Sequence, residues 1–382
     1  MSEADRVNRV QWDIYCRVVD NFGDAGVCAR LARQLVAEHG LDVCLWIDRL
    51  DVLARLWPGI DVALAQQTVD GVLLCRWQPR DVPRADAAVV IEAFACALGD
   101  EAIAAMAARE RAPLWLNLEY LSAESWVEGS HGLRSIDTWS GLPKVFFFPG
   151  FTQATGGLLR EADEESQRRH FVVHEREAFL SALNVPQVAE ALYVSLFAYP
   201  DAPVADGLEI IAAGDQPTIV LMPDGALRAT AEVVCGGALS VGVPFRRGAL
   251  TLVLLPFLAQ HDYDRLLWSC DVNAVRGEDS FVRAQWAGSP LLWQAYRQAD
   301  AAHEVKLAAF LARYTAGWPA PAADAVTALH GAWNRGALTP AVWQDAMHCR
   351  ADWRAGAENW RRQQADLPDL ASKLVQFYTD WL

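Results

Sequence analysis

The chain alternates apolar strands with helices in two successive series, which restricts it to α/β folds with mostly parallel sheets. Between the strands, segments such as 25–40 carry apolar residues at helical spacing and end in glycine. Runs rich in apolar and β-branched residues predict the strands of the first series at 12–19, 41–48, 85–94, 113–120 and 144–150. The second series predicts strands at 191–199, 217–225, 249–257, 271–275 and 289–296, before a helical tail.

Two α/β series of similar length predict two Rossmann-like domains that face each other across a cleft. We assign residues 1–183 to the first domain and 184–365 to the second, with a C-terminal helix at about 366–382 that could pack back on the first. In open α/β sheets, ligands bind outside the carboxyl ends of the parallel strands. The loops that follow the strands are therefore the segments in which we look for functional residues.

Charge and hydropathy exclude several classes of protein. Of the 382 residues, 53% are hydrophobic, so the chain can form a sizeable core. Acidic residues outnumber basic ones by 48 to 33, which argues against general binding to nucleic acid or to a membrane surface. No run of about 18 uncharged apolar residues occurs, and the N-terminus lacks a signal-peptide core. The eight cysteines are scattered without a CxxC pair, so we expect reduced thiols and a cytoplasmic location.

The segment DNFGD, residues 20–24, lies between the first predicted strand and the first predicted helix. Its two carboxylates, Asp20 and Asp24, flank a turn in which Gly23 permits the close approach of another molecule. The same pattern also fits an ordinary turn in which Asp24 or Asn21 caps the helix. GxGxxG and GxxxxGK[ST] are absent, so this is neither a dinucleotide fingerprint nor a P-loop.

The segment RGEDS, residues 276–280, follows a predicted strand and opens a predicted helix. The first amides of a helix hold anions, Gly277 leaves room for one, and Arg276 adds a fixed cation. Glu278 and Asp279 suit the hydroxyls of a sugar better than a phosphate. The alternative is that Asp279 or Ser280 only caps the helix.

Aromatic residues also stand at strand ends. Phe257 ends strand 249–257, where it could stack on a base with Gln260 as a hydrogen-bonding partner. Tyr199 ends strand 191–199 in the same way. By position alone, a place in the core explains Phe257 better than base binding, and Tyr199 has the same two explanations.

Metal and nucleophile motifs are weak. Asp262 and Asp264 have DxD spacing, but they open a predicted helix, where the helix dipole accounts for them better. HExxH and GxSxG are absent. We therefore expect no bound metal.

Five long segments of the chain are unusual: CRVVDNFGDAGVCARLARQL, WLNLEYLSAESWV, FFFPGFTQATGGLLRE, PFLAQHDYDRLLW and RGEDSFVRAQWAG. They resemble the protein-arginine rhamnosyltransferases that modify elongation factor P. The similarity runs from the first strand to about residue 300, and Ala29 and Arg297 depart from it where a tryptophan and a proline are expected.

This resemblance implies a GT-B fold, with an acceptor-binding first domain and a second domain that binds the nucleotide sugar. The implied reaction is an inverting, metal-independent transfer of L-rhamnose from dTDP-β-L-rhamnose to an arginine of elongation factor P, supporting relief of ribosome stalling at polyproline. No cofactor, nucleic acid or membrane partner is implied. By motif matching, Asp20 is the base, Glu278 a second catalytic or sugar-orienting group, and Asp24 a supporting residue. The implied substrate-binding residues are Asn21, Phe22, Gly23, Tyr199, Phe257, Gln260, Arg276, Gly277, Asp279 and Ser280.

The chemistry limits what Asp20 can do. A guanidinium has a pKa above about 12 and an aspartate one near about 4, so deprotonation before attack would cost roughly 11 kcal/mol. We expect Asp20 to pin the guanidinium, localise a lone pair on one nitrogen and take the proton late, with Asp24 and Glu119 as further acids of the acceptor pocket.

Two other classes of function remain open at this stage. One is a GT-B transferase with another nucleotide sugar and a carbohydrate or lipid acceptor. The other is a non-catalytic protein that binds a nucleotide sugar or a dinucleotide. The paired acids of DNFGD and RGEDS disfavour the second of these.

Overall fold

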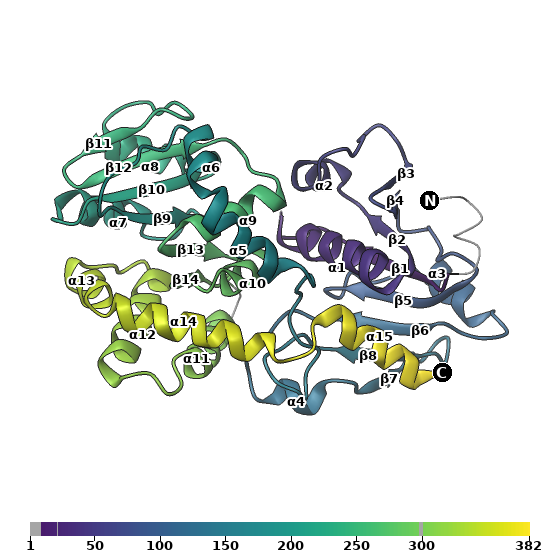
Figure 1. Cartoon of the computed structure of the whole chain (residues 1–382). Helices are drawn as coiled ribbons and strands as arrows, with labels where there is room; N and C mark the ends of the chain where they lie inside the picture. The colour runs from purple at the N-terminus through teal and green to yellow at the C-terminus, as the bar shows by residue number, and fades with distance from the viewer. Residues whose placement is uncertain (1–8, 21, 298–300) are drawn as a thin grey trace. The chain divides into compact units, whose positions relative to one another are not determined.

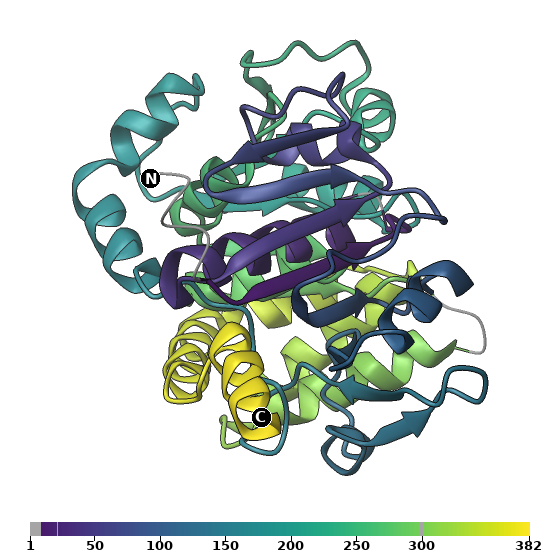
Figure 2. The same cartoon turned by 90° about the vertical axis from the view of Figure 1, so that its right-hand side faces the viewer.

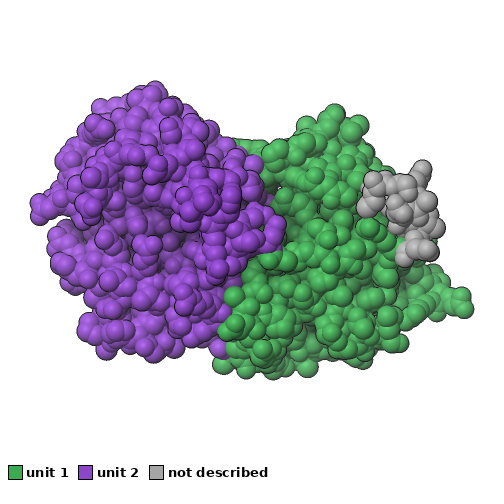
Figure 3. Space-filling model, viewed as in Figure 1, with its two compact units in different colours: residues 1–162, 364–382 green, residues 163–363 purple. Residues whose placement is uncertain are grey.

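The structure is a computed structural model that describes residues 9–20, 22–297 and 301–382. The chain divides into two compact units (Figure 3). Unit 1 comprises Met1–Ala162 and Gln364–Leu382, and unit 2 comprises Asp163–Gln363. Each unit contains a mostly parallel sheet covered by helices, so the predicted α/β class is confirmed (Figure 1).

The sheet of unit 1 has the order β3-β4-β2-β1-β5-β6-β8-β7. All neighbouring pairs are parallel except β3 with β4 and β7 with β8, which form antiparallel edges. The central strands β1 and β5 are almost entirely buried, as in a sheet covered on both faces. The strands are β1 (Gln11–Cys16), β2 (Asp42–Ile47), β3 (Gln66–Val69), β4 (Val72–Arg76), β5 (Ala87–Ala93), β6 (Leu114–Leu118), β7 (Arg134–Ile136) and β8 (Pro143–Phe147).

The helices of unit 1 are α1 (Gly23–His39), α2 (Leu50–Leu56), α3 (Asp100–Ala107), α4 (Trp126–Ser130) and α15 (Leu370–Trp381). The C-terminal helix α15 packs beside α1 (Figures 1 and 2). Gln34 of α1 donates from Nε2 to Asp369 Oδ1 at 3.1 Å, and Asp369 caps α15 by accepting the N–H of Ser372. The last residues of the chain therefore complete the core of the unit in which the chain begins.

The sheet of unit 2 has the order β11-β12-β10-β9-β13-β14, with β11 as its antiparallel edge. Its strands are β9 (Leu192–Leu196), β10 (Thr218–Pro223), β11 (Phe245–Arg247), β12 (Leu250–Leu255), β13 (Val272–Arg276) and β14 (Leu291–Gln294). Because β12, β10, β9, β13 and β14 all run parallel to one another, the loops after β12, β9 and β13 lie at one edge of the sheet.

Helices surround this second sheet and continue into the tail (Figure 1). They are α5 (Glu164–His174), α6 (Arg176–Ala182), α7 (Val204–Ala213), α8 (Arg228–Cys235), α9 (Gln260–Ser269), α10 (Asp279–Ala287), α11 (Ala302–Tyr314), α12 (Ala320–Arg335), α13 (Pro340–His348) and α14 (Arg350–Ala365). None of the helices in the part of the chain that the structure describes is long and apolar enough to cross a membrane.

The division between the units falls earlier than the sequence analysis places it. Residues 163–183, assigned there to the first domain, belong to unit 2. The physical reason is that α5 and α6 pack on α9. Phe171 contacts Trp268 at 5.7 Å between ring centroids, and Arg176 donates from Nη2 to the carbonyl of Ser269 at 2.7 Å.

Candidate functional site

Two carboxylates hold the loop between β1 and α1. Asp24, in the first turn of α1, accepts the backbone N–H groups of Val19 and Asp20 through Oδ2, at 2.8 and 2.9 Å. Asp48, which follows β2, accepts the N–H of Val18 at 3.0 Å. Because these bonds run from side chain to backbone, they set the path of the loop and with it the position of Asp20.

Asp24 is only 2% exposed. Burial raises the pKa of its carboxyl above the ordinary value, and the N–H groups of Asp20 and Val19 oppose this shift. The hydroxyl of Tyr120 donates to the other oxygen, Oδ1, at 3.5 Å. Asp24 therefore orients the loop that carries Asp20.

Asp20 is half-buried and folds back toward the start of α1. A Cβ at Gly23 would lie 3.0 Å from Asp20 Oδ2, and the Gly23 N–H donates to the Asp20 carbonyl at 2.7 Å. The close approach that this glycine permits is thus that of the Asp20 carboxylate itself. The Phe22 ring lies 5.2 Å from the Arg55 guanidinium. Asn21, a predicted substrate-binding residue, lies outside the described residues.

In unit 2, the turn between β13 and α10 has a left-handed glycine at its apex, Gly277, with a φ of 63°. Its N–H donates to the carbonyl of Gln294 at 3.2 Å, and its carbonyl accepts from Trp293 Nε1 at 2.8 Å. Glu278 is the N-cap residue of α10, and its side chain makes no capping hydrogen bond within the described chain. A helix start of this kind, after a glycine, is typical of anion sites.

Arg276 supplies the cation of this turn. Its guanidinium carbon lies 4.6 Å from the ring centroid of Phe197 and 4.3 Å from that of Tyr199, both after β9. Tyr199 is itself fixed, because its N–H donates to Gln294 Oε1 at 2.7 Å and Tyr296 packs edge-on against it. The Ser280 hydroxyl donates to the Arg276 carbonyl and closes the turn. These contacts restrict the cation to a narrow range of positions.

Asp279 and Gln260 belong to a buried polar network. Asp279 Oδ2 accepts from Arg283 Nε at 2.9 Å and from Gln260 Nε2 at 3.3 Å. Arg283 also donates to Asp264 at 2.6 Å. The network ties the start of α9 to the start of α10, so Asp264 of the DxD pattern is an ion-pair partner in this structure.

Phe257 and Glu278 lie at the same edge of the sheet of unit 2. Phe257 follows β12, Glu278 follows β13, and both are half-buried. The structure therefore brings the predicted residues of unit 2 to the carboxyl ends of β9, β12 and β13. It places Asp20 and Asp24 after β1 of unit 1.

Sequence reasoning missed several residues that shape these loops. They are Asp48, Phe94 and Tyr120 in unit 1, and Phe197, Arg283 and Gln294 in unit 2. All but Arg283 end a strand or follow one, so the rule that directed attention to Asp20 and Arg276 could have found them.

No group of three or more His, Cys, Asp and Glu side chains that could hold a metal ion occurs within residues 9–20, 22–297 and 301–382. The turn between β13 and α10 carries a guanidinium and helix amides, which suit an anion.

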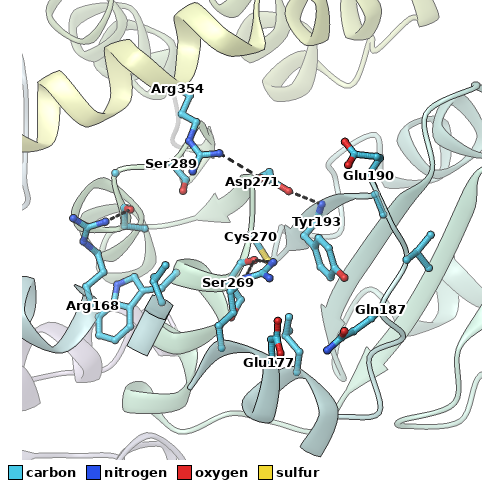
Figure 4. A pocket seen from close by; sticks show the side chains of 18 of the residues that line it. Arg168, Glu177, Gln187, Glu190, Tyr193, Ser269, Cys270, Asp271, Ser289 and Arg354 are labelled. Carbon is cyan, nitrogen blue, oxygen red and sulfur yellow. Dashed lines mark hydrogen bonds and ion pairs between the residues drawn. The ribbon is translucent and has the colours of Figure 1, made fainter. Parts of the chain in front are cut away.

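A cavity of about 1000 Å³ lies elsewhere in unit 2, at the amino ends of β9 and β13 (Figure 4). Its walls include Arg354, which approaches Asp271 at 3.7 Å, and Asp271 also accepts the N–H of Tyr193 at 2.9 Å. Arg176, on the same wall, is occupied by the carbonyl of Ser269. None of the predicted site residues lines this cavity, and it occupies the edge of the sheet opposite to them.

The two mostly parallel α/β units have the architecture of the GT-B glycosyltransferases. The fold resembles that of the glycosyltransferase SnogD from Streptomyces nogalater, with a TM-score of 0.50 at 13% identity, covering 97% of this chain and 99% of the other. The model of the EarP family, described as elongation-factor P (EF-P) rhamnosyltransferase, matches residues 12–379. The chain belongs to the EarP family and is an enzyme of the glycosyltransferase class.

Relatives agree with this assignment over their whole length. A protein-arginine rhamnosyltransferase of Pseudomonas putida KT2440 is 51% identical over 377 residues, which cover 98% of this chain and 100% of the relative. A solved structure that concerns EarP-mediated arginine glycosylation of translation elongation factor EF-P has a TM-score of 0.70 at 38% identity. The match covers 98% of this chain and 100% of the chain in that structure.

Proposed function

We propose that this chain transfers L-rhamnose from dTDP-β-L-rhamnose to an arginine side chain of elongation factor P, with inversion at the sugar carbon, in the cytoplasm. The proposal rests on one observation. This member of the EarP family has a carboxylate loop, with Asp20 and Asp24, after β1 and an arginine–glycine turn, Arg276-Gly277, after β13. The first suits a cationic acceptor and the second suits a diphosphate.

Unit 2 has the groups that a nucleotide diphosphate needs. The amides at the start of α10 and the guanidinium of Arg276 would neutralise the phosphates. Phe257 would stack on the base, and Gln260 would hydrogen-bond to it. Glu278 would orient the sugar hydroxyls. In this proposal Asp279 acts through Arg283 and Gln260, to which it is bonded.

Unit 1 has the groups that an arginine acceptor needs. A carboxylate pairs with a guanidinium through charge-assisted hydrogen bonds, which fix the plane of the cation. Asp20 would make this pair, because Asp24 already uses Oδ2 to hold the backbone of the loop. The pair would localise a lone pair on one nitrogen.

The transfer step is a single displacement. The nitrogen lone pair attacks the anomeric carbon, the bond from that carbon to the phosphate oxygen breaks, and dTDP leaves with the electron pair. The proton passes from the nitrogen to a carboxylate late in the step, because early deprotonation would cost roughly 11 kcal/mol. Arg276 and the α10 amides would stabilise the departing charge without a metal.

The proposal is tested by incubating the chain with elongation factor P and dTDP-β-L-rhamnose. We expect the intact mass of the factor to rise by one deoxyhexose, fragmentation to place it on one arginine, and NMR to report the α-anomer. Factor with that arginine changed to alanine is the control and should gain no mass.

No mass gain, with both substrates intact and the enzyme folded, would refute the proposal. Transfer from a different nucleotide sugar in the same assay would instead support the alternative of a GT-B transferase with another donor. Retention of the β-configuration would refute the single displacement alone.

A further inference from the structure

Phe94 and Tyr120 form an aromatic pair at the carboxyl edge of the sheet of unit 1. Phe94 follows β5 and Tyr120 lies two residues after β6, and β5 is the direct neighbour of β1. The two rings stack with centroids 4.6 Å apart and planes inclined by 18°. Both side chains are half-buried, so part of each remains accessible.

The pair is joined to the carboxylate loop. The Tyr120 hydroxyl lies 3.5 Å from Asp24 Oδ1, and Asp24 in turn holds the N–H of Asp20 at 2.9 Å. The aromatic pair and the carboxylates of Asp20 and Asp24 are therefore linked by a continuous series of contacts at the ends of β1, β5 and β6. This combination is what a planar cation requires, because its face can stack on a ring while its edge bonds to carboxylates.

The backbone that presents Phe94 is unusual. Phe94, Ala95 and Ala97 have φ values of 57°, 52° and 56°, in the left-handed region that residues other than glycine rarely adopt. The Phe94 N–H donates to the Leu118 carbonyl at 2.7 Å, which ties this segment to the end of β6. Left-handed residues of this kind concentrate at functional sites, where surrounding contacts enforce them.

We propose that the Phe94–Tyr120 pair binds the face of the acceptor guanidinium and selects arginine over lysine as the acceptor. This inference rests on the proposed function and assigns to unit 1 the residues that recognise the acceptor side chain. A lysine ammonium has no plane to lie along the rings and cannot bond two carboxylate oxygens in parallel. The pair positions the acceptor, and the carboxylates receive its proton.

The test compares Phe94→Leu, Tyr120→Leu and Tyr120→Phe with the parent enzyme in steady-state transfer to elongation factor P. We expect the two leucine variants to raise the acceptor KM about tenfold or more, with the dTDP dissociation constant within twofold of the parent. Tyr120→Phe keeps the ring, so its acceptor KM should stay near the parent value. Its kcat should fall, because the bond to Asp24 is lost.

Tyr378→Leu is the matched control. Tyr378 is another half-buried aromatic of unit 1, packed edge-on against Trp12 at the amino end of β1. The Tyr378→Leu substitution should leave the acceptor KM unchanged. Thermal midpoints and dTDP affinity identify any variant that fails to fold. Because Phe94 stands on left-handed backbone, Tyr120→Leu keeps the test valid if Phe94→Leu is unstable.

A second measurement separates this inference from the proposed function. Calorimetry with methylguanidine and methylammonium reports binding of the bare cations without turnover. We expect the parent enzyme to bind methylguanidine more tightly, and the leucine variants to lose that preference. Equal binding of both cations by the parent, or an acceptor KM within twofold of the parent in folded leucine variants, would overturn the inference. Absence of rhamnose transfer by the parent would refute only the proposed function.

Discussion

The guanidinium carbon of Arg276 lies 4.3 Å from the ring centroid of Tyr199, which ties the end of β13 to the end of β9. Phe197 contacts the same cation, so Arg276 is held by two aromatic residues. A flat guanidinium can stack in this way while its N–H groups point outward in the plane, and an ammonium cannot.

Replacing Arg276 by lysine therefore keeps the positive charge but removes the flat guanidinium. We expect Arg276→Lys to weaken dTDP binding about tenfold or more, because the ammonium loses both the stacking and the paired donors. Isothermal titration calorimetry measures this. Arg297→Lys is the control, since Arg297 is 59% exposed and pairs with Asp201 at 3.1 Å. Equal effects of the two substitutions would contradict the role of Arg276.

Phe257 tests the base-binding role. Phe257→Ala should weaken dTDP binding about 5- to 150-fold, as expected for the loss of about 1–3 kcal/mol of base stacking. The thermal midpoint should change little, because the side chain is half-buried at the end of a strand. Unchanged dTDP affinity together with a large fall in the thermal midpoint would mean that Phe257 is a core residue and does not bind the base.

Asp20 and Glu278 should differ in which step they affect. Asp20→Asn should leave dTDP affinity unchanged and lower kcat about 10²- to 10⁴-fold, since a positioned proton acceptor is lost. Glu278→Gln should lower both turnover and dTDP-rhamnose affinity, because Glu278 stands at the start of α10. If Asp20→Asn turns over within a few-fold of the parent, Asp20 is only a turn residue, and Asp24 or Glu278 becomes the leading proton acceptor.

Metal independence is tested by chelation. Because Arg276 and the amides at the start of α10 would neutralise the phosphates in the proposed reaction, we expect rhamnose transfer to proceed at an unchanged rate in excess EDTA. The measurement is the initial rate before and after addition of Mg²⁺ or Mn²⁺. Loss of activity in EDTA that either ion restores would show that a metal takes part.

Glu164 makes stability depend on pH. Burial raises the pKa of its carboxyl to about 8, and neither of its oxygens has a hydrogen-bond partner within the described chain. Arg168 and Arg361 favour its charge, whereas Asp264 and Glu165 oppose it. The folded state therefore holds a proton that the unfolded state releases above about pH 4.5. The contribution of Glu164 to the free energy of unfolding therefore falls as the pH rises from about 4.5 to about 8, and it stays constant above that pH.

Glu164→Gln replaces the titratable carboxyl with a neutral amide, so the free energy of unfolding should depend less on pH. We expect the variant to match the parent near pH 5 and to exceed it in free energy of unfolding near pH 8.5. Chemical denaturation at both pH values measures the difference. A variant that is less stable than the parent at the higher pH would mean that the ionised Glu164 is stabilised by Arg168 and Arg361.

The parallel core of each sheet could be predicted because buried parallel strands are continuous apolar runs. The antiparallel edges could not be predicted in the same way. β7 and β11 have three residues each, too few for a period. The β3–β4 hairpin did carry a signal, the dipeptide Asp70-Gly71, whose φ values of 47° and 84° make a tight turn between the two strands.

The sequence alone determined the alternation of the parallel strands with helices, the α/β class and the loops that carry Asp20 and Arg276, because periodicity and turn chemistry are local. Tertiary structure decided which side chains hold those loops. Asp48 reaches Val18 across 30 positions, Tyr120 reaches Asp24 across 96, and Gln294 reaches Tyr199 across 95. Parallel strands that are distant in the sequence end at the same edge of a sheet, so only the pairing of the strands brings these partners together.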